Sequence, residues 1–306
     1  MAYTVRKLFS RTGTLIENVS VIGKRLLSNE TIQGFQTLKI SELEPYVYGV
    51  ALNRPDKLNA LNDRMWREIR SVFDELGKDP KCRSIVLSGN GRIFTAGIDI
   101  MGFSKLLPEL TAEKDISVKA KFLYEFIVVY QQCISAVEKC PKPVIAAVHN
   151  ACIGAGVDLI STADIRYCTE DAYFQIKEVD LGLAADVGTL QRFPKVVGNE
   201  SLARELCYTA RKMNSSEASS LGFVNNVAPD VSSMMEKATS TASKIAEKSP
   251  VAVQGTKINI LHARDHTVDE SLEYQARWNS LMLQSEDTLT AVMGMMSKTN
   301  PEFNDL

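Results

Sequence analysis

Three carboxylic acids, Asp158, Glu178 and Asp186, lie within 29 residues of one another in a segment that is otherwise mostly apolar. Acids in apolar surroundings tend to have raised pKa values, because burial disfavours the charged form. A carboxyl group with a raised pKa exchanges protons near neutral pH and can serve as a general acid or a general base. The spacing of these acids therefore predicts proton-transfer chemistry.

A glycine-rich turn precedes the first acid at residues 152–158, where Gly154 and Gly156 flank Ala155. Glycine lets the backbone approach a ligand closely, because it has no Cβ. The apolar residues that follow predict the start of a buried helix, whose first N–H groups have no partner within the helix. Unpaired N–H groups suit a developing oxyanion. The turn and the acids together predict an enzyme that stabilises an enolate and moves protons.

Three segments, residues 94–99, 140–158 and 174–188, carry a family resemblance. In these segments the chain resembles the enoyl-CoA hydratase/isomerase (crotonase) family, and the resemblance covers roughly residues 35–295. Within that family, the three acids are similar to those of the Δ3,5-Δ2,4-dienoyl-CoA isomerases. The resemblance implies an isomerase of unsaturated fatty acid β-oxidation, which converts a 3,5-dienoyl-CoA into a 2,4-dienoyl-CoA.

The pattern of apolar residues predicts an α/β fold, because strands and helices alternate. Strands are expected at 46–52, 84–88 and 144–148, and helices at 116–138 and at 61–76, where Gly77 ends the helix. Beyond about residue 200 the pattern is mostly helical, over 215–221, 232–247, 251–262 and 268–283. The resemblance implies a crotonase-like ββα spiral core at 35–225 and a C-terminal helical trimerisation region at 226–306. It therefore also implies a homotrimer or homohexamer.

The resemblance assigns binding residues as well. It implies an oxyanion hole for the thioester carbonyl, formed by the backbone N–H groups of Ile98 and Ala155, with Gly97 and Gly154 leaving room for the ligand. Such donors can contribute about 3–4 kcal/mol each to transition-state stabilisation. Other positions border coenzyme A in the family, namely Ala96 and Ile100 on the adenine side and Arg54 and Lys57 near the phosphates. Lys257, late in the chain, is a further candidate to reach a phosphate from the C-terminal region.

Isomerisation of a 3,5-dienoyl thioester removes a proton from C2 and returns one at C6, so two flanking acids are expected. We expect Glu178 to act at C2 and Asp186 at C6, with Asp158 tuning both through shared protons and repulsion. The sequence leaves open which acid serves which carbon. Each acid also has a structural interpretation. Asp158 would cap or pair within its helix, Glu178 would be a solvated surface residue, and Asp186 would be the N-cap of a helix over 187–193.

Two other functions fit the pattern less well. A 2-enoyl-CoA hydratase resembles this chain but uses two acids rather than three, so Asp186 discriminates against it. A catalytically idle acyl-CoA-binding or RNA-associated scaffold would not need the acids and glycine turns. A net charge of −2 also argues against nucleic acid as a partner. No apolar run approaches the length of a membrane span.

No cofactor is expected beyond the coenzyme A of the substrate. The third glycine of a dinucleotide-binding motif is missing after Gly156, and no phosphate-binding loop or zinc-protease motif occurs. Three histidines and six cysteines without a CxxC pair give no basis for a metal site or a disulfide framework.

The N-terminal segment differs in charge from the rest of the chain. Residues 1–28 contain five Lys or Arg and one Glu, a net charge of +4. Residues 1–30 therefore resemble a mitochondrial transit peptide, although a basic disordered arm would have the same composition. The final residues, Asn304, Asp305 and Leu306, differ from a Ser-Lys-Leu peroxisomal signal. We expect location in the mitochondrial matrix.

Overall fold

A six-stranded sheet forms the centre of the computed structural model, which describes residues 34–104 and 115–306. The expected transit peptide, residues 1–30, lies outside the described residues. Apart from the antiparallel first pair, neighbouring strands of the sheet run parallel. The strands lie in the order β1 (Leu38–Glu44), β2 (Val47–Leu52), β3 (Ser84–Gly89), β4 (Val144–Val148), β6 (Ile165–Thr169) and β9 (Asn226–Ala228). The predicted strands at 46–52, 84–88 and 144–148 are confirmed.

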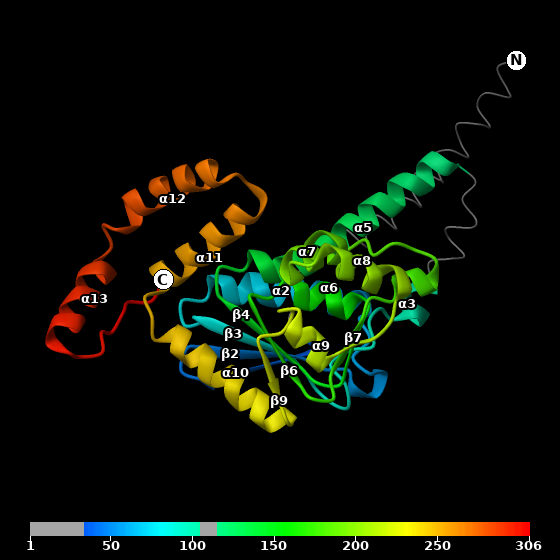
Figure 1. Cartoon of the computed structure of the whole chain (residues 1–306), viewed down its shortest axis with the longest axis horizontal. Helices are drawn as coiled ribbons and strands as arrows, with labels where there is room; N and C mark the ends of the chain where they lie inside the picture. Colours follow the sequence, from blue (N-terminus) through cyan, green and yellow to red (C-terminus); the bar gives the residue numbers. More distant parts are fainter. Residues whose placement is uncertain (1–33, 105–114) are drawn as a thin grey trace, which may run out of the picture.

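Both faces of this sheet are buried, as is typical of parallel sheets. In β3, Ile85 and Leu87 belong to one apolar core while Val86 belongs to a second core on the opposite face. Two long helices, α2 (Asp63–Lys78) and α5 (Ile116–Lys139), contribute to the first core, and α10 (Val231–Ala246) to the second. Figure 1 shows α10 along the face of the sheet opposite to α2. The chain is therefore layered as helix, sheet and helix.

A smaller sheet brings distant parts of the chain together. It contains β5 (Ala151–Ile153), β7 (Tyr173–Gln175) and β8 (Met213–Asn214), in that order. Isolated bridges then join Thr95 to Cys152 and Leu61 to Ile98. These bridges place the segment around residue 97 beside the glycine turn at 154–156. Shorter helices surround the two segments, namely η1 (Pro55–Lys57), α3 (Ile100–Ser104), α6 (Ala155–Ser161), η2 (Glu178–Leu181), α7 (Thr189–Val197), α8 (Glu200–Thr209) and α9 (Ser215–Ser220).

Gly77 does not end its helix as the sequence suggests. The α2 helix starts where the side chain of Asn62 accepts a hydrogen bond from Met65 N at 3.0 Å, and it continues to Lys78. Gly77 therefore lies inside α2. A Cβ at this position would lie 3.1 Å from Cδ of Pro141, so the glycine allows α2 to pass close to the chain that leaves α5. Its role is close packing rather than termination.

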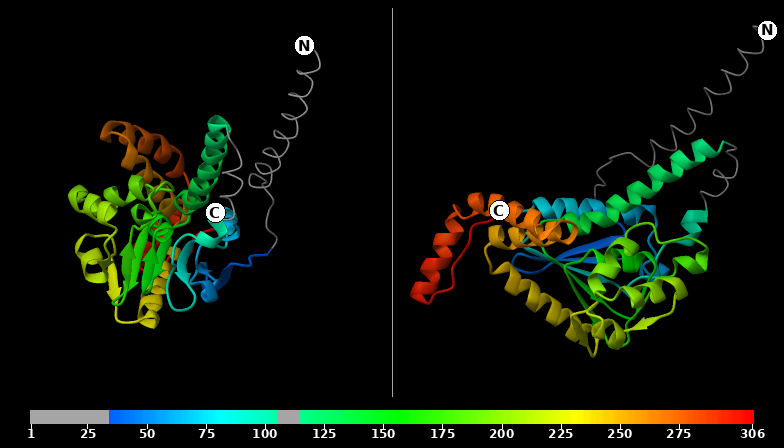
Figure 2. Two further views of the ribbon diagram at one scale, coloured as in Figure 1. Left: turned by 90° about the vertical axis from the view of Figure 1, so that its right-hand side faces the viewer. Right: turned by 45° about the horizontal axis from the view of Figure 1, so that its top comes forward.

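The C-terminal helices leave the central sheet after α10. Although β9 and α10 follow residue 225, they pair with or cover the sheet. The three helices beyond them form an arm that projects from the core (Figures 1 and 2). These helices are α11 (Pro250–Asp265), α12 (Val268–Met282) and α13 (Glu286–Ser297). No helix within the described ranges has the length and apolar character needed to span a membrane.

Candidate active site

A cavity of about 340 Å³ lies where the segment around residue 97, the start of α6 and the loop after η2 meet. It is lined by every residue predicted for the site except Arg54, Lys57 and Lys257. The predicted residues that line it are Ala96, Gly97, Ile98, Ile100, Gly154, Ala155, Asp158, Glu178 and Asp186. These residues come from four separate segments of the chain, and the bridges between the segments bring them together.

The backbone around Ile98 directs its N–H away from the strand that it bridges. Leu61 N donates to Gly97 O at 2.8 Å, and Asp99 N donates to Leu61 O at 3.0 Å. Gly97 O and Asp99 N thus both face Leu61. In a trans peptide the N–H of Ile98 points opposite to Gly97 O, so it faces away from Leu61. Gly97 has a φ of +89°, and a Cβ there would lie 2.7 Å from Ile153 O. Only glycine fits this approach, which brings residue 97 within reach of the Ala155 turn.

Ala155 is the first residue of α6, so its N–H has no acceptor one turn earlier in the helix. The neighbouring Gly154 N already donates to Gln175 O at 2.8 Å. Among the described residues, no hydrogen bond uses the N–H of either Ile98 or Ala155. The cavity therefore contains two free backbone donors from neighbouring segments, which is the arrangement needed to bind an oxyanion.

Asp158 is the most buried of the three acids, with 1% of its surface exposed. Its Oδ1 atom accepts a hydrogen bond from Thr189 N at 2.5 Å. Burial, followed by the negative charge of Glu178, raises the pKa of Asp158 to about 7. The carboxyl group does cap a helix, but that helix is α7 rather than its own.

Glu178 begins η2 and lies against the glycine turn. A Cβ on Gly154 would be 3.3 Å from Oε1 of Glu178. The Oε2 atom is buried, and no group of the described residues hydrogen bonds to it. Burial and the charge of Asp186 raise the pKa of Glu178. Glu178 is thus not the solvated surface residue that its neighbours in the sequence allow.

Asp186 lines the open side of the cavity, and its side chain is exposed there. Partial burial raises the pKa of its carboxyl group. It is not a helix N-cap, because α7 starts at Thr189 and its N-cap is Gly188. All three acids therefore have raised pKa values in one cavity, and the charge of Asp186 contributes to the raised pKa values of Asp158 and Glu178. Such a cluster can hold one carboxylate as a base while another remains protonated as an acid.

Aromatic side chains form one wall of the cavity, and no motif in the sequence indicates them as part of a site. Trp66 of α2 and Tyr130 of α5 stack with ring centroids 4.6 Å apart, and the Phe126 ring lies 4.4 Å from that of Tyr130. All three are buried and hydrogen-bond or pack within the core. Helical spacing marks Phe126 as a core residue, but no local signal shows that the same ring also borders a ligand cavity.

The cations expected near coenzyme A phosphates lie outside the cavity. Arg54 Nη1 lies 3.0 Å from Oδ2 of Asp99, and the same atom donates to the carbonyl of Ala60. Lys57 is exposed on η1. Lys257 is only 6% exposed, and its Nζ lies 2.8 Å from Oδ2 of Asp164. Of these three cations, Lys57 is the one that is exposed at the surface.

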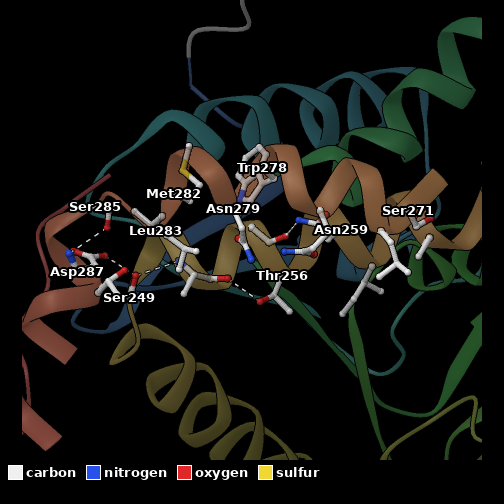
Figure 3. A pocket seen from close by; sticks show the side chains of 18 of the residues that line it. Ser249, Thr256, Asn259, Ser271, Trp278, Asn279, Met282, Leu283, Ser285 and Asp287 are labelled. Carbon is white, nitrogen blue, oxygen red and sulfur yellow. Dashed lines mark hydrogen bonds between the residues drawn. The ribbon is translucent and has the colours of Figure 1, made fainter. Parts of the chain in front are cut away.

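A second cavity, of about 690 Å³, lies between α11, α12 and α13 (Figure 3). Trp278 packs over Gly255, where a Cβ would lie 2.6 Å from the indole nitrogen. The carboxylate of Asp287 accepts a hydrogen bond from Ser249 Oγ at 2.5 Å. This cavity has no cluster of acids. Residues 34–104 and 115–306 also contain no group of three His, Cys, Asp or Glu that could hold a metal ion.

The fold and the cavity define a member of a known family. The family model for enoyl-CoA hydratase/isomerase matches residues 42–306, so the chain belongs to the enoyl-CoA hydratase/isomerase (crotonase) family. It is 48% identical to the mitochondrial Δ3,5-Δ2,4-dienoyl-CoA isomerase of Rattus norvegicus, over 93% of this chain and 87% of that protein. It is 43% identical to the peroxisomal Δ3,5-Δ2,4-dienoyl-CoA isomerase of Arabidopsis thaliana, over 90% of this chain and 100% of that protein.

The solved structures support the same fold. A putative enoyl-CoA hydratase from Streptomyces coelicolor superimposes with a TM-score of 0.79 at 27% identity, covering 91% of this chain and 98% of that one. The expected crotonase-like α/β fold is confirmed.

Proposed function

We propose that this chain is an isomerase that converts 3,5-dienoyl-CoA thioesters into 2,4-dienoyl-CoA thioesters during the β-oxidation of unsaturated fatty acids. The observation that carries the proposal is the convergence of three acids with raised pKa values and two free backbone N–H groups in one cavity. The relatives named as dienoyl-CoA isomerases, at 43–48% identity over at least nine tenths of this chain, support it.

In the proposed reaction, ionised Glu178 removes the proton from C2 of the substrate. The electron pair of that bond forms the C2–C3 double bond, the C3–C4 pair moves to C4–C5, and the C5–C6 pair takes a proton at C6 from Asp186. The N–H groups of Ile98 and Ala155 stabilise the negative charge on the thioester oxygen of the dienolate. Glu178 ends protonated and Asp186 ionised, and a proton transfer among the acids restores the starting state.

Asp158 is proposed to favour this distribution of protons. It shares the cavity with the other two acids, and after burial the charges of Glu178 and Asp186 raise its pKa, so its protonation depends on theirs. The reaction transfers no electrons to or from an outside group. It therefore requires no cofactor beyond the coenzyme A of the substrate itself.

The rival function is hydration of a 2-enoyl-CoA, since the solved relative from Streptomyces coelicolor is titled a putative hydratase. A hydratase needs acids that hold one water, and Asp158 and Glu178 would meet that need without Asp186. An idle acyl-CoA-binding scaffold would need none of the three. Incubation of the purified protein with 3,5-octadienoyl-CoA, and separately with a 2-enoyl-CoA, distinguishes these functions. We expect conjugated dienoyl absorbance to appear with the first substrate. Turnover of the second substrate alone, or of neither, would contradict the proposal.

The acyl-CoA is proposed to enter past Ile100 and the apolar residues Leu181 and Leu183, which line the open side of the cavity. In this pose the backbone at Ala96 borders the adenine, as the family resemblance implies, and exposed Lys57 reaches a phosphate. Arg54 is proposed to contribute by holding Asp99, because its Nη1 atom pairs with that carboxylate and donates to Ala60 O.

We also propose that the arm formed by α11, α12 and α13 joins copies of the chain into a homotrimer or homohexamer. The arm exposes large apolar side chains that its own helices leave uncovered, namely Ile260, Val268, Leu272, Leu281, Leu283, Leu289, Val292, Met293, Met295 and Met296. Large exposed apolar surface of this kind marks an interaction site. Light scattering during size-exclusion chromatography should give three or six times the chain mass. A monomer at micromolar concentration would contradict this assignment.

Location in the mitochondrial matrix is proposed from the basic residues 1–28 and from the rat relative, which is named mitochondrial. The Arabidopsis relative is named peroxisomal, so location differs between relatives. A fusion of residues 1–35 to a fluorescent reporter should enter mitochondria. A cytosolic reporter together with full-length protein in peroxisomes would show the assignment to be wrong.

A further inference from the structure

The loop at residues 182–188 carries Asp186 from the end of η2 to the start of α7. Its carboxylate receives no hydrogen bond from another described residue, so the backbone of the loop sets its place in the cavity. Side chains of α5 contact the backbone of the loop on the side away from the catalytic cavity. Gln131 of α5 donates from Nε2 to the carbonyl oxygen of Asp186 at 2.7 Å.

A second contact holds the loop two residues later. A Cβ on Gly188, which has a φ of +141°, would lie 2.0 Å from Nη1 of Arg192. The guanidinium therefore lies directly against the Cα of Gly188, and no larger residue fits while it stays there. Arg192 is itself held by Glu138, with Nε and Nη2 at 3.1 and 3.0 Å from the two carboxylate oxygens, and by Ser135 Oγ at 3.0 Å.

Glu138 is a rigid anchor for this contact. It is buried, and it also receives Arg264 of α11. Burial alone would raise the pKa of Glu138, but the hydrogen bonds from Arg192 and Arg264 outweigh burial and lower it. Glu138 therefore stays ionised and keeps both guanidinium groups in place.

One helix face organises these contacts. Gln131, Ser135 and Glu138 are spaced by four and three residues, so they lie along the same side of α5. The helix also carries Phe126 and Tyr130 into the wall of the catalytic cavity. Behind the loop is a polar hollow of about 450 Å³, which shares Val187 with that cavity. The 182–188 loop therefore lies between the catalytic cavity and the polar hollow, and α5 contacts the loop from the side of the hollow.

We propose that Gln131 and the Glu138–Arg192 pair are positioning residues that fix the 182–188 loop so that Asp186 reaches the carbon at which the proton is returned. The inference rests on the proposed function, because it assigns these residues to the C6 step of the isomerisation. The C2 step does not depend on them, since Glu178 begins η2, before the loop, and lies against the glycine turn at Gly154. Loss of the α5 contacts should therefore impair one of the two proton transfers selectively.

The test compares Gln131→Met with the matched control Gln132→Met. Methionine keeps the length of glutamine but donates no hydrogen bond. Gln132 is the next residue on α5, and its side chain instead accepts from Arg70 of α2 at 3.0 Å. Two rates are measured for each protein with 3,5-octadienoyl-CoA in heavy water, the formation of 2,4-dienoyl-CoA and the exchange of the C2 proton in recovered substrate.

For Gln131→Met we expect kcat for isomerisation to fall between about 10- and 100-fold, as displacement of a reacting group by about 1 Å can produce. KM should stay within twofold, and the ratio of C2 exchange to isomerisation should rise. Arg192→Met combined with Glu138→Gln, which leaves no unpaired buried carboxylate, should act in the same direction. Gln132→Met should match the parent. The ratio is independent of the fraction of folded protein, so it separates positioning from stability.

The inference is overturned if Gln131→Met isomerises within twofold of the parent, or if exchange and isomerisation fall in parallel. Failure of the proposed function has a different signature, because the parent protein itself would then not form the 2,4-dienoyl product.

Discussion

The Oδ1 atom of Asp158 accepts a hydrogen bond from the backbone N–H of Thr189 at 2.5 Å, across 31 positions of the chain. This contact joins α6 to the start of α7, whose first N–H groups have no partner inside the helix. Asp158 therefore caps a helix and belongs to the acid cluster at the same time. An oxygen of the carboxyl group can accept this hydrogen bond whether the group is ionised or protonated, so the cap does not require the negative charge. The charge matters to stability for a separate reason.

Asp158→Asn should stabilise the folded protein at pH 8 and have little effect at pH 4. Burial and the charge of Glu178 raise the pKa of Asp158 from about 3.8 to about 7. Between these two pH values the carboxyl group of Asp158 is ionised in the unfolded chain but protonated in the folded protein. The free energy of unfolding therefore falls as pH rises. The loss is complete above pH 7, at most roughly 4 kcal/mol. Asparagine does not ionise, so it avoids this loss of stability, and its side-chain oxygen still accepts the hydrogen bond from Thr189 N. Urea denaturation at the two pH values measures the difference.

Asp171→Asn is the matched control of opposite sign. The hydrogen bond from Thr169 holds the pKa of Asp171 below its usual value. The ionised carboxylate of Asp171 therefore adds stability above the ordinary pKa of aspartate. That stability is lost as the pH falls through the lower pKa of the folded protein. This variant should therefore be less stable than the parent at pH 8. If Asp158→Asn also loses stability at pH 8, the carboxyl group of Asp158 is not a buried acid with a raised pKa.

Asp186→Asn should lower isomerisation by about 10²–10⁴-fold, the usual contribution of a general acid or base. The amide has the same shape as the carboxyl group but cannot deliver a proton to C6. The side chain is exposed in the cavity, so stability should change by no more than about 0.5 kcal/mol. Dienoyl absorbance measures the first effect, and thermal unfolding with CoA-thioester binding measures the second. Activity within twofold of the parent would remove Asp186 from the mechanism.

Glu178→Gln should abolish exchange of the C2 proton. Glu178 Oε2 is buried and receives no hydrogen bond from the described residues, so a carboxylate there is free to accept a substrate proton, whereas glutamine is not. The readout is incorporation of deuterium at C2 from heavy water. Asp180→Asn is the control, because Asp180 is an exposed acid of the same turn whose partner is Lys177 at 4.0 Å. Unchanged exchange in Glu178→Gln would move the base role to Asp158.

Much of the fold follows from local signals. Runs of β-branched residues predict β2, β3 and β4, and helical periodicity predicts α2, α5 and α10. These signals are local because burial of one face fixes the spacing of apolar residues. Helices α8 and α13 are not predicted. The ten residues of α8 place only Ala203, Leu206 and Cys207 in the core, which is too short a pattern to separate a helix from a loop.

The site is predicted less evenly. Residues on the glycine turn and the acids are recognisable because the family motif contains them, and they do line one cavity. The contacts that hold these residues are not recognisable from sequence. Nothing near Gln131 or Thr189 indicates a partner at residue 186 or 158, because side-chain direction across distant segments depends on the whole fold. For the same reason, Arg54 is expected at a phosphate, whereas its guanidinium pairs with Asp99.

Ala155→Pro should lower kcat by about 10²–10³-fold, the effect of removing one oxyanion donor. Ala155 is the first residue of α6, where proline is tolerated because the missing N–H has no partner in the helix. The substitution therefore removes a donor from the cavity without breaking a hydrogen bond of the fold. Ala155→Ser is the control, since it adds a side-chain hydroxyl and keeps the N–H. Steady-state kinetics should show a fall in kcat with little change in KM for proline and a near-parental kcat for serine. Equal losses in both variants would mean that the side chain at 155, rather than its N–H, matters to the reaction.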